Sequence, residues 1–280
     1  MIIVIDALNK HLFDGVLDDM FRLRARVFGD RLGWDVTIED GKEIDRFDHL
    51  DPAYVVGLDD DGNVVAAVRA LQTTGPHMLA DVFSDILCGE PPIRSSTMWE
   101  STRFCVDTQR LNRGKDRNSV SYATCELMIG SLEYARRAGI SDIVTVIDPV
   151  MDRVLKRSDN APYDYVGKTV PMGKVPALAA LLDTGEERVE RVRQFAGIAH
   201  DVFLSDDEAL ALFNRTHAGA DEDAASATPL ERYLKEQIQA AVGEEELKAV
   251  QSLIEALAGS LDPRRKQGLL DTPKLVAREA

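Results

Sequence analysis

The stretch "TMWESTRFCVDT", Thr97–Thr108, alternates like a β-strand, yet it carries a glutamate and an arginine three residues apart. Strict alternation places Arg103 on one face of such a strand and Glu100, with Phe104, on the other. A β-bulge adds one residue and re-aims the side chains that follow it, so a bulge here would bring both charges to one pocket. The alternative is an edge strand with a charged outer face, and this segment alone leaves both open.

Composition bounds the class of protein. The chain has 280 residues, of which 45% are hydrophobic, so it can bury one substantial core and still carry an appendage. Its formal charge of -15 opposes nonspecific binding to nucleic acid and to anionic membranes, because the long-range field repels phosphate. We therefore expect no nucleic-acid partner.

Targeting and metal signals are both missing from the sequence. No apolar run approaches the ~20 residues of a membrane span, and the start meets charged residues too soon for a secretory signal. We therefore expect a cytoplasmic protein without integral membrane contact. The three cysteines form no CxxC and the five histidines form no HExxH pair, so neither a disulfide framework nor a metal site is expected.

Hydrophobic periodicity predicts a layered α/β domain. The first half predicts a strand at Ile2–Ile5, a helix at Phe13–Phe28 and a hairpin of Tyr54–Leu58 with Val64–Leu71 around an Asp-Gly turn. Between helix and hairpin, residues 29–51 form a long loop rich in acidic and aromatic residues.

The second half continues the alternation of helices and strands. After the charged strand, the pattern predicts a helix at Val120–Ala138, a strand at Asp142–Asp148, a helix at Met151–Arg157, two further strands, and a helix at Glu186–Phe195. Strands surrounded by helices indicate an αβα layered fold about a mixed sheet.

A change of composition divides the chain. The segment "HAGADEDAASATP", His217–Pro229, is too poor in large apolar residues to hold a fold. We expect a main domain over residues 1–204, a partly disordered linker over 205–229 and a helical C-terminal extension of open role over 230–280. Packing of the extension on its own domain is favoured over pairing with a partner.

Several separated motifs then appear in a fixed order. They are "RLRARVFGDRLGW" with Arg24, Phe28 and Trp34; "EIDRFDHLDPAYVV" with Glu43, Asp45, Phe47 and Asp48; "RAL" at Arg69; and "WESTRF". Together they resemble the motif set of the LuxI-type N-acyl-homoserine lactone synthases, which make bacterial quorum-sensing signals. The resemblance covers roughly Met1 to Leu204 and leaves the C-terminal segment unexplained.

The resemblance implies a fold and an activity. The fold is related to the GNAT acetyltransferases, with a twisted mixed sheet whose strands Met98–Val106 and Asp142–Asp148 splay apart to hold a thioester. The activity is an acyltransferase reaction that joins S-adenosylmethionine to an acyl group carried on acyl carrier protein, or in some members on coenzyme A. It releases an acyl-homoserine lactone and methylthioadenosine, so S-adenosylmethionine is a substrate and no cofactor is expected.

The chemistry assigns roles to the charged strand. Only a neutral α-amino group attacks a thioester, and Glu100 is the candidate base, because a desolvated carboxylate has a pKa nearer neutrality. The rival role for Glu100 is a salt bridge that orients Arg103. Backbone N–H groups near Ser101 to Phe104 are candidate donors to the oxyanion.

By the resemblance, the remaining site residues fall into two groups. The S-adenosylmethionine pocket comprises Arg24, Phe28, Trp34, Arg103 and, as a weaker member, Phe104. A charge cluster of Asp45, Asp48 and Arg69 holds the mobile loop shut through charge-assisted hydrogen bonds.

The acyl donor and acyl chain have candidate contacts as well. Thr145, Met151 and Leu155 are candidate lining for the acyl chain, and the Thr145 hydroxyl would bond either a 3-oxo group or the backbone. The segment "LNRGKDRN" has no convincing pyrophosphate-binding loop, which favours acyl carrier protein over coenzyme A. The basic residues that would dock an acidic carrier protein are Arg110, Arg113, Lys115, Arg153, Lys156 and Arg157.

Two other functions stay open on the sequence. One is a GNAT-like transferase that acylates another amine from coenzyme A, which predicts no methylthioadenosine. The other is a noncatalytic interaction protein that uses the acidic helical tail, and truncation before Asp221 separates it from an enzyme.

Overall fold

The computed structural model describes a chain that divides into two compact units. The described residues are 1–108, 122–172, 175–225, 230, 234, 237–238, 241, 243–257, 266 and 269–270. The units are Met1–Thr216 and His217–Ala280. The first unit carries every described residue of the candidate site.

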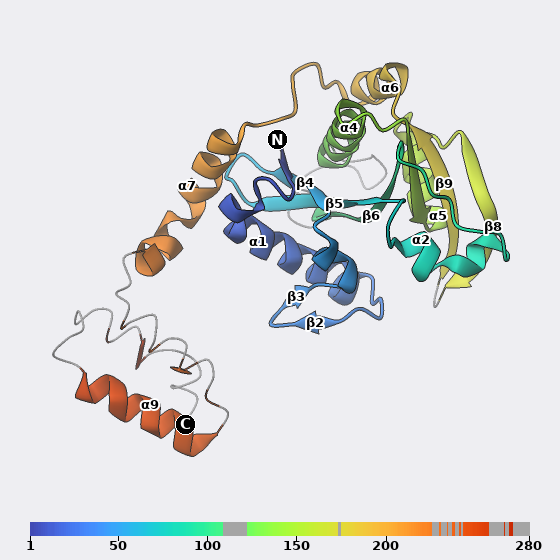
Figure 1. Ribbon diagram of the computed structural model, residues 1–280. Coiled ribbons are helices and arrows are strands. Elements are labelled where there is room, and N and C mark those ends of the chain that lie inside the picture. Colours follow the sequence, from blue (N-terminus) through green and yellow to red (C-terminus); the bar gives the residue numbers. More distant parts are fainter. Residues whose placement is uncertain are drawn as a thin grey trace. The chain divides into compact units, whose positions relative to one another are not determined.

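A seven-stranded sheet in the order β1-β4-β5-β6-β7-β9-β8 organises the described part of the first unit (Figure 1). The strands are β1 (Ile2–Ile5), β4 (Ala53–Leu58), β5 (Val64–Gln72), β6 (Met98–Val106), β7 (Asp142–Ile147), β8 (Asp164–Met172) and β9 (Val175–Asp183). Only the β6–β7 pair is parallel among these neighbours. A separate two-stranded sheet joins β2 (Ile38–Glu39) to β3 (Lys42–Glu43).

Helices cover both faces of the sheet, so the predicted αβα fold is confirmed. The described α-helices of the first unit are α1 (Asp14–Arg24), α2 (Met78–Asp81), α4 (Tyr122–Arg137), α5 (Pro149–Arg157), α6 (Glu186–Ala196) and the start of α7 (Asp206–Ala225). Short helical turns are η1 (Lys10–Leu12), η3 (Arg46–Leu50) and η4 (Ser84–Leu87). Helix α4 lies on one face of the sheet and α1 on the other (Figure 1).

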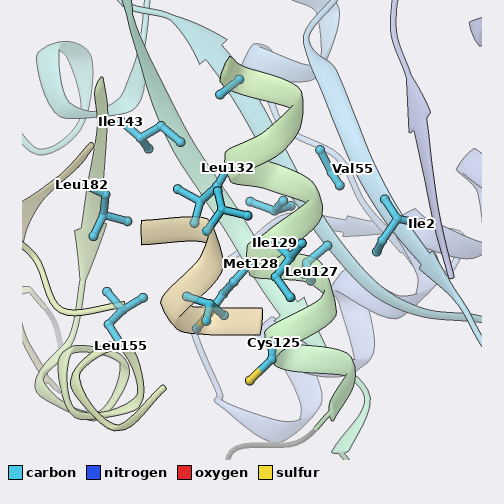
Figure 2. Packing of buried hydrophobic residues seen from close by; sticks show 14 of the residues in the cluster. Ile2, Val55, Cys125, Leu127, Met128, Ile129, Leu132, Ile143, Leu155 and Leu182 are labelled. Atoms are coloured by element: carbon cyan, nitrogen blue, oxygen red, sulfur yellow. The ribbon is translucent and has the colours of Figure 1, made fainter. Parts of the chain in front are cut away.

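The face covered by α4 is apolar. Buried side chains of α4 such as Leu127 and Leu132 pack against Val55 of β4 and Ile143 of β7, with Leu155 of α5 in the same cluster (Figure 2). Helix α4 ends at Arg137, and the turn that follows it contains Gly139, whose φ of 77° is a left-handed conformation that favours glycine. Helix α4 therefore covers the central strands on this face of the sheet.

The helix predicted for Phe13–Phe28 changes type part-way. Its α-helical part ends at Arg24, and the chain continues as the π-helix η2 over Ala25–Arg31. The Leu32 N–H donates to the Val27 carbonyl at 3.0 Å, which is the wider repeat of a π-turn. This wider turn carries Phe28 beside the candidate site.

The linker predicted for residues 205–229 is wrong over most of its length, because Asp206–Ala225 forms α7. Ala209, Leu212 and Phe213 recur at helical spacing and are buried in the α1-face core. The first unit therefore reaches Thr216, beyond the predicted boundary at residue 204.

The second unit has an apolar core of its own. Leu234, Ile238, Leu247 and Ile254 belong to one buried cluster, and α9 (Glu244–Ala256) supplies two of these side chains. Helix therefore occurs in the predicted extension 230–280. None of the described helices in either unit is long and apolar enough to cross a membrane.

Candidate active site

Strand β6 contains the bulge that the sequence had left open as one of two alternatives. Its pairing with β5 shifts register between Ala67 and Arg69, and Arg103 has a φ of 55°. The left-handed conformation costs a non-glycine residue about 1 kcal/mol or more, so surrounding contacts must hold it. Arg103 thereby joins Glu100 beside Met78: Glu100 accepts the Met78 N–H at 2.6 Å, and Arg103 Nη1 lies 3.6 Å from the Met78 sulfur.

The same bulge removes Phe104 from the predicted S-adenosylmethionine pocket. Phe104 and Trp99 pack against the α4-face cluster, whereas Arg103 lies over Phe28, which is buried on the α1 face. The extra residue inverts the alternation after Arg103, so Phe104 no longer shares a face with Glu100. The placement of Phe104 with that pocket is therefore wrong.

Glu43 of β3 was named in the second motif without a role, and the structure places it in the site. Its side chain is 1% exposed and pairs with two arginines. Arg24 Nε donates to Glu43 Oε2 at 2.6 Å, and Arg103 Nη2 donates to Oε1 at 3.0 Å. The sequence signal for Glu43 was its position as the first residue of the second motif, "EIDRFDHLDPAYVV".

Asp48 is the most heavily hydrogen-bonded carboxylate of the site. It accepts both terminal nitrogens of Arg24 at 2.8 and 2.9 Å, Arg69 Nη1 at 2.8 Å, the Tyr54 hydroxyl at 2.7 Å and the Asp45 N–H at 2.8 Å. Burial by itself raises the pKa of Asp48, but Arg24 and then Arg69 outweigh it and hold the pKa well below its usual range. Asp48 is therefore ionised at all working pH values. Tyr54, predicted only as the first residue of a strand, also belongs to this site.

Asp45 joins this cluster to the bulge. Its carboxylate pairs with Arg69 at 2.6 Å and with Arg103 at 2.9 Å. Arg69 Nε donates to the Thr102 hydroxyl at 3.0 Å. The structure therefore brings the predicted cluster of Asp45, Asp48 and Arg69 together and joins it to Arg24 and Arg103. Three guanidinium groups balance the three carboxylates of Glu43, Asp45 and Asp48.

An aromatic pair borders the arginine at the bulge. Phe28 and Trp34 stack with ring centroids 5.0 Å apart, and the Arg103 guanidinium lies 5.6 Å from the Phe28 centroid. Phe28 is buried, whereas Trp34 is 42% exposed. Such a face suits a cation or a heterocyclic ring.

Glu100 of β6 is fully buried against the first residues of α2. Its carboxylate accepts the Met78 and Leu79 N–H groups, both at 2.6 Å. Burial raises the pKa of Glu100 to about 7, against the opposing effect of these two N–H groups and of Arg69. The salt-bridge role proposed for Glu100 is wrong, because the ion pairs of Arg103 among the described residues go to Glu43 and Asp45.

Strands β6 and β7 separate beside this site. Their parallel pairing runs from Met98 opposite Asp142 to Ser101 opposite Thr145, although both strands continue beyond. The Thr145 hydroxyl donates to the Ser101 carbonyl at 3.0 Å. Of the two alternatives for this hydroxyl, a 3-oxo group or the backbone, the structure contains the bond to the backbone. The expected splay of the two strands is present.

The other candidate residues for the acyl chain lie on α5. Leu155 is buried in the α4-face cluster, and Met151 is partly buried against it. Alternation along β7 places Thr145 on the same face as Ile143 and Ile147 of that cluster. The three predicted residues therefore share one face of the sheet.

Half of the predicted docking residues are described. Arg153, Lys156 and Arg157 are exposed on α5. Lys156 pairs with Asp152 at 2.7 Å and lies 5.5 Å from the Tyr165 ring centroid. The remaining three, Arg110, Arg113 and Lys115, lie outside the described residues.

Comparison with known proteins identifies the family. A model described as autoinducer synthase matches residues 9–192. The chain belongs to the autoinducer synthase family. An acyl-homoserine-lactone synthase of Agrobacterium fabrum is 39% identical over 176 residues, which cover 63% of this chain and 82% of the relative. One from Pseudomonas aeruginosa is 34% identical over 147 residues, covering 51% and 70% of the two chains.

Solved structures of autoinducer synthases share the fold. The synthase LasI aligns with a TM-score of 0.57 and 29% identity, covering 69% of this chain and 94% of LasI. MesI, described as a CoA-dependent acyl-homoserine lactone synthase, aligns with a TM-score of 0.61 and 26% identity, covering 72% and 98%. The predicted family is thus confirmed, and with it an acyltransferase of quorum-sensing signal synthesis. The match to the family model ends at residue 192, before the second unit begins.

Proposed function

We propose that this autoinducer synthase makes an acyl-homoserine lactone from S-adenosylmethionine and an acyl thioester, with S-adenosylmethionine as substrate and no cofactor. The observation that carries the proposal is the bulge of β6. It sets Arg103 beside the Phe28–Trp34 stack and on the same face of β6 as Glu100, on the strand that separates from β7.

Arg103 is the guanidinium best placed to receive the carboxylate of S-adenosylmethionine. Its side chain is 12% exposed, whereas those of Arg24 and Arg69 are 1% and 0% exposed. The exposed face of Trp34 would receive the adenine or the sulfonium. Arg24 and Arg69 then act indirectly, by fixing the carboxylates that hold Arg103.

Glu100 would accept the proton of the attacking amine. The neutral nitrogen bonds to the thioester carbonyl carbon, the C–S bond breaks, and the sulfur leaves as a thiolate, which becomes the thiol by taking the second proton that the nitrogen loses. A carboxyl group with a pKa of about 7 suits a general base near neutral pH. Backbone N–H groups of β6 near Ser101 to Phe104, where pairing with β7 ends, are our candidates to stabilise the oxyanion.

Lactonisation would follow in the same pocket. The substrate carboxylate attacks its own γ carbon, and the C–S bond of the sulfonium breaks to release neutral methylthioadenosine. No proton is needed by the leaving group, so the pocket chiefly has to hold the substrate in a folded shape.

We favour acyl carrier protein as the donor. Arg153 and Arg157 are exposed on α5 and complement an acidic partner. The double variant Arg153→Glu with Arg157→Glu should raise KM for acyl carrier protein thioesters while leaving that for coenzyme A thioesters unchanged. Equal kinetics with the carrier protein would refute docking at α5, and the kinship with CoA-dependent MesI makes the coenzyme A arm essential.

Mass spectrometry of the products tests the proposed reaction. Purified protein is mixed with S-adenosylmethionine and a panel of both kinds of thioester, and lactone and methylthioadenosine should appear together. Arg103→Ala should lower kcat/KM by about 100-fold, from loss of a charge-assisted contact. The control is Arg191→Ala, an arginine on α6 whose ion pair with Glu187 lies at the surface. Thiol release without methylthioadenosine would instead indicate acylation of another amine.

A further inference from the structure

A small cavity lies between α4 and the sheet. Val55, Trp99, Ser101 and Ile143 line it from the strands, and Ser131 and Tyr134 line it from α4. Figure 2 shows Val55 and Ile143 flanking α4. Its volume of about 10 Å³ is room for roughly one water molecule.

This cavity begins where β6 and β7 stop pairing. Ser101 is the last residue of β6 that pairs with β7, and it is also part of the cavity wall. Ile143 of the wall lies two positions before Thr145 on β7, so the two share the α4 face. An acyl chain that enters between the strands on this face therefore meets the cavity.

Two aromatic rings close the cavity. Trp99 of β6 and Tyr134 of α4 have ring centroids 5.4 Å apart. The Tyr134 hydroxyl donates to Asp6 at 3.2 Å, which holds the ring in place from its far end. Ser131 precedes Tyr134 by one helical turn, and its small side chain leaves the existing space.

Resting on the proposed function, we propose that Trp99, Ser131 and Tyr134 form the end wall of the acyl-chain site and set the length of chain that this enzyme transfers. Space for about one water molecule remains in front of the wall. A longer chain must displace an aromatic ring that packing and the bond to Asp6 hold in place. The wall thus selects the shorter acyl groups of a graded series.

Two variants should move the chain-length preference in opposite directions. Tyr134→Ala removes the ring and should favour longer chains, whereas Ser131→Val fills the remaining space and should favour shorter ones. Each methylene accommodated or refused should change the ratio of kcat/KM values by about tenfold. Tyr134→Phe keeps the ring and its packing but loses the bond to Asp6, so its ratio should lie between those of the wild type and Tyr134→Ala.

The assay measures methylthioadenosine release with thioesters of graded length on the full chain. Tyr122→Ala is the matched control, a tyrosine on the same helix that is 45% exposed and absent from the cavity wall. Leu155→Ala opens the alternative route toward α5. A preference that shifts with Leu155→Ala but not with the two wall variants would overturn the proposal.

The proposed function and this inference fail in different ways. If the wild type releases methylthioadenosine but Tyr134→Ala and Ser131→Val leave the chain-length ratio unchanged, the end wall is refuted and the synthase stands. If Tyr134→Ala does not fold, Ser131→Val alone decides the inference. Absence of methylthioadenosine with every thioester refutes the proposed function and the inference together.

Discussion

The two faces of β6 have opposite characters. On the α1 face, Thr102 and Arg103 bond to a network of buried charges, and Glu100 is buried with its carboxylate on the Met78 N–H. On the α4 face, Trp99 and Phe104 of the same strand pack into an apolar core. The bulge at Arg103 makes this division possible, because it sends two charged residues of one strand to the same side.

This contrast indicates that the two faces of β6 place different demands on the protein. Buried charges are stable only when each finds partners, so the α1 face must be ordered before a polar substrate arrives. The apolar face needs only shape, and it can vary with the acyl group without disturbing the ion pairs. We therefore expect stability and substrate binding to respond differently to changes on the two faces.

The largest effect should come from Asp48→Ala on the charged face. The change leaves Arg24 and Arg69 buried without a shared partner, so the free energy of unfolding should fall by about 3–5 kcal/mol. Urea unfolding at pH 7 measures it. Asp51→Ala, which removes the exposed partner of Lys10, is the control and should change stability by less than about 1 kcal/mol. A small loss for Asp48→Ala would mean that the network is not stabilising.

Leu127→Ala tests the apolar face. Leu127 is fully buried in the α4-face core, so the cavity left behind should lower the free energy of unfolding by about 3 kcal/mol. The affinity for S-adenosylmethionine, measured by calorimetry below the melting range, should stay unchanged. A matching loss of affinity would show that the two faces are coupled.

Comparing the stability of Glu100→Gln with that of the wild type over a pH series tests the charged face through one titrating group. The pKa of Glu100 is about 7 in the folded protein and 4.5 in the unfolded chain, so the folded state prefers the protonated form. Its stabilising contribution is complete below pH 4.5 and is lost as pH rises through about 7, a change of roughly 3 kcal/mol.

The measured quantity is the difference in free energy of unfolding between wild type and Glu100→Gln. The free energy of unfolding of the wild type minus that of the variant should decrease as pH rises across that window. The carboxyl group of the wild type titrates there, whereas the amide of the variant does not. A difference that stays constant with pH would place the pKa of Glu100 at an ordinary value and remove its qualification as base.

The smallest effect should come from the surface of α5. Lys156→Met breaks an exposed pair with Asp152, and solvent already screens that pair, so thermal unfolding should not change measurably. A clear drop in melting temperature would show that surface pairs matter here as much as buried ones.

Local pattern was sufficient for much of the fold. Strand β1 was predicted with its bounds. The predicted Asp-Gly turn of the β4–β5 hairpin is present at Asp61-Gly62, where Gly62 has a φ of 82°. Both signals lie within a few adjacent residues. The start of α7 was missed because the sequence alone does not show the core against which its apolar residues pack.

The site was predictable where motifs carried it and less so where pairing decided it. Sequence alone suggested a bulge between Glu100 and Arg103, but it did not fix which later residue changes face, and Phe104 was therefore misplaced. Glu43 was named in a motif but given no role, because β3 is only two residues long and the partners of Glu43 are arginines from α1 and β6.

The chain's two tryptophans report on the two faces separately. Trp34 stacks on Phe28 at the charged face, and Trp99 packs on Tyr134 at the apolar face. The decisive measurement is tryptophan fluorescence during titration with S-adenosylmethionine, in Trp99→Phe, which retains Trp34, and in Trp34→Phe, which retains Trp99. If S-adenosylmethionine binds on the charged face, the emission of Trp34 changes and that of Trp99 stays constant. A response from Trp99 alone would place S-adenosylmethionine on the apolar face and contradict the division proposed for β6.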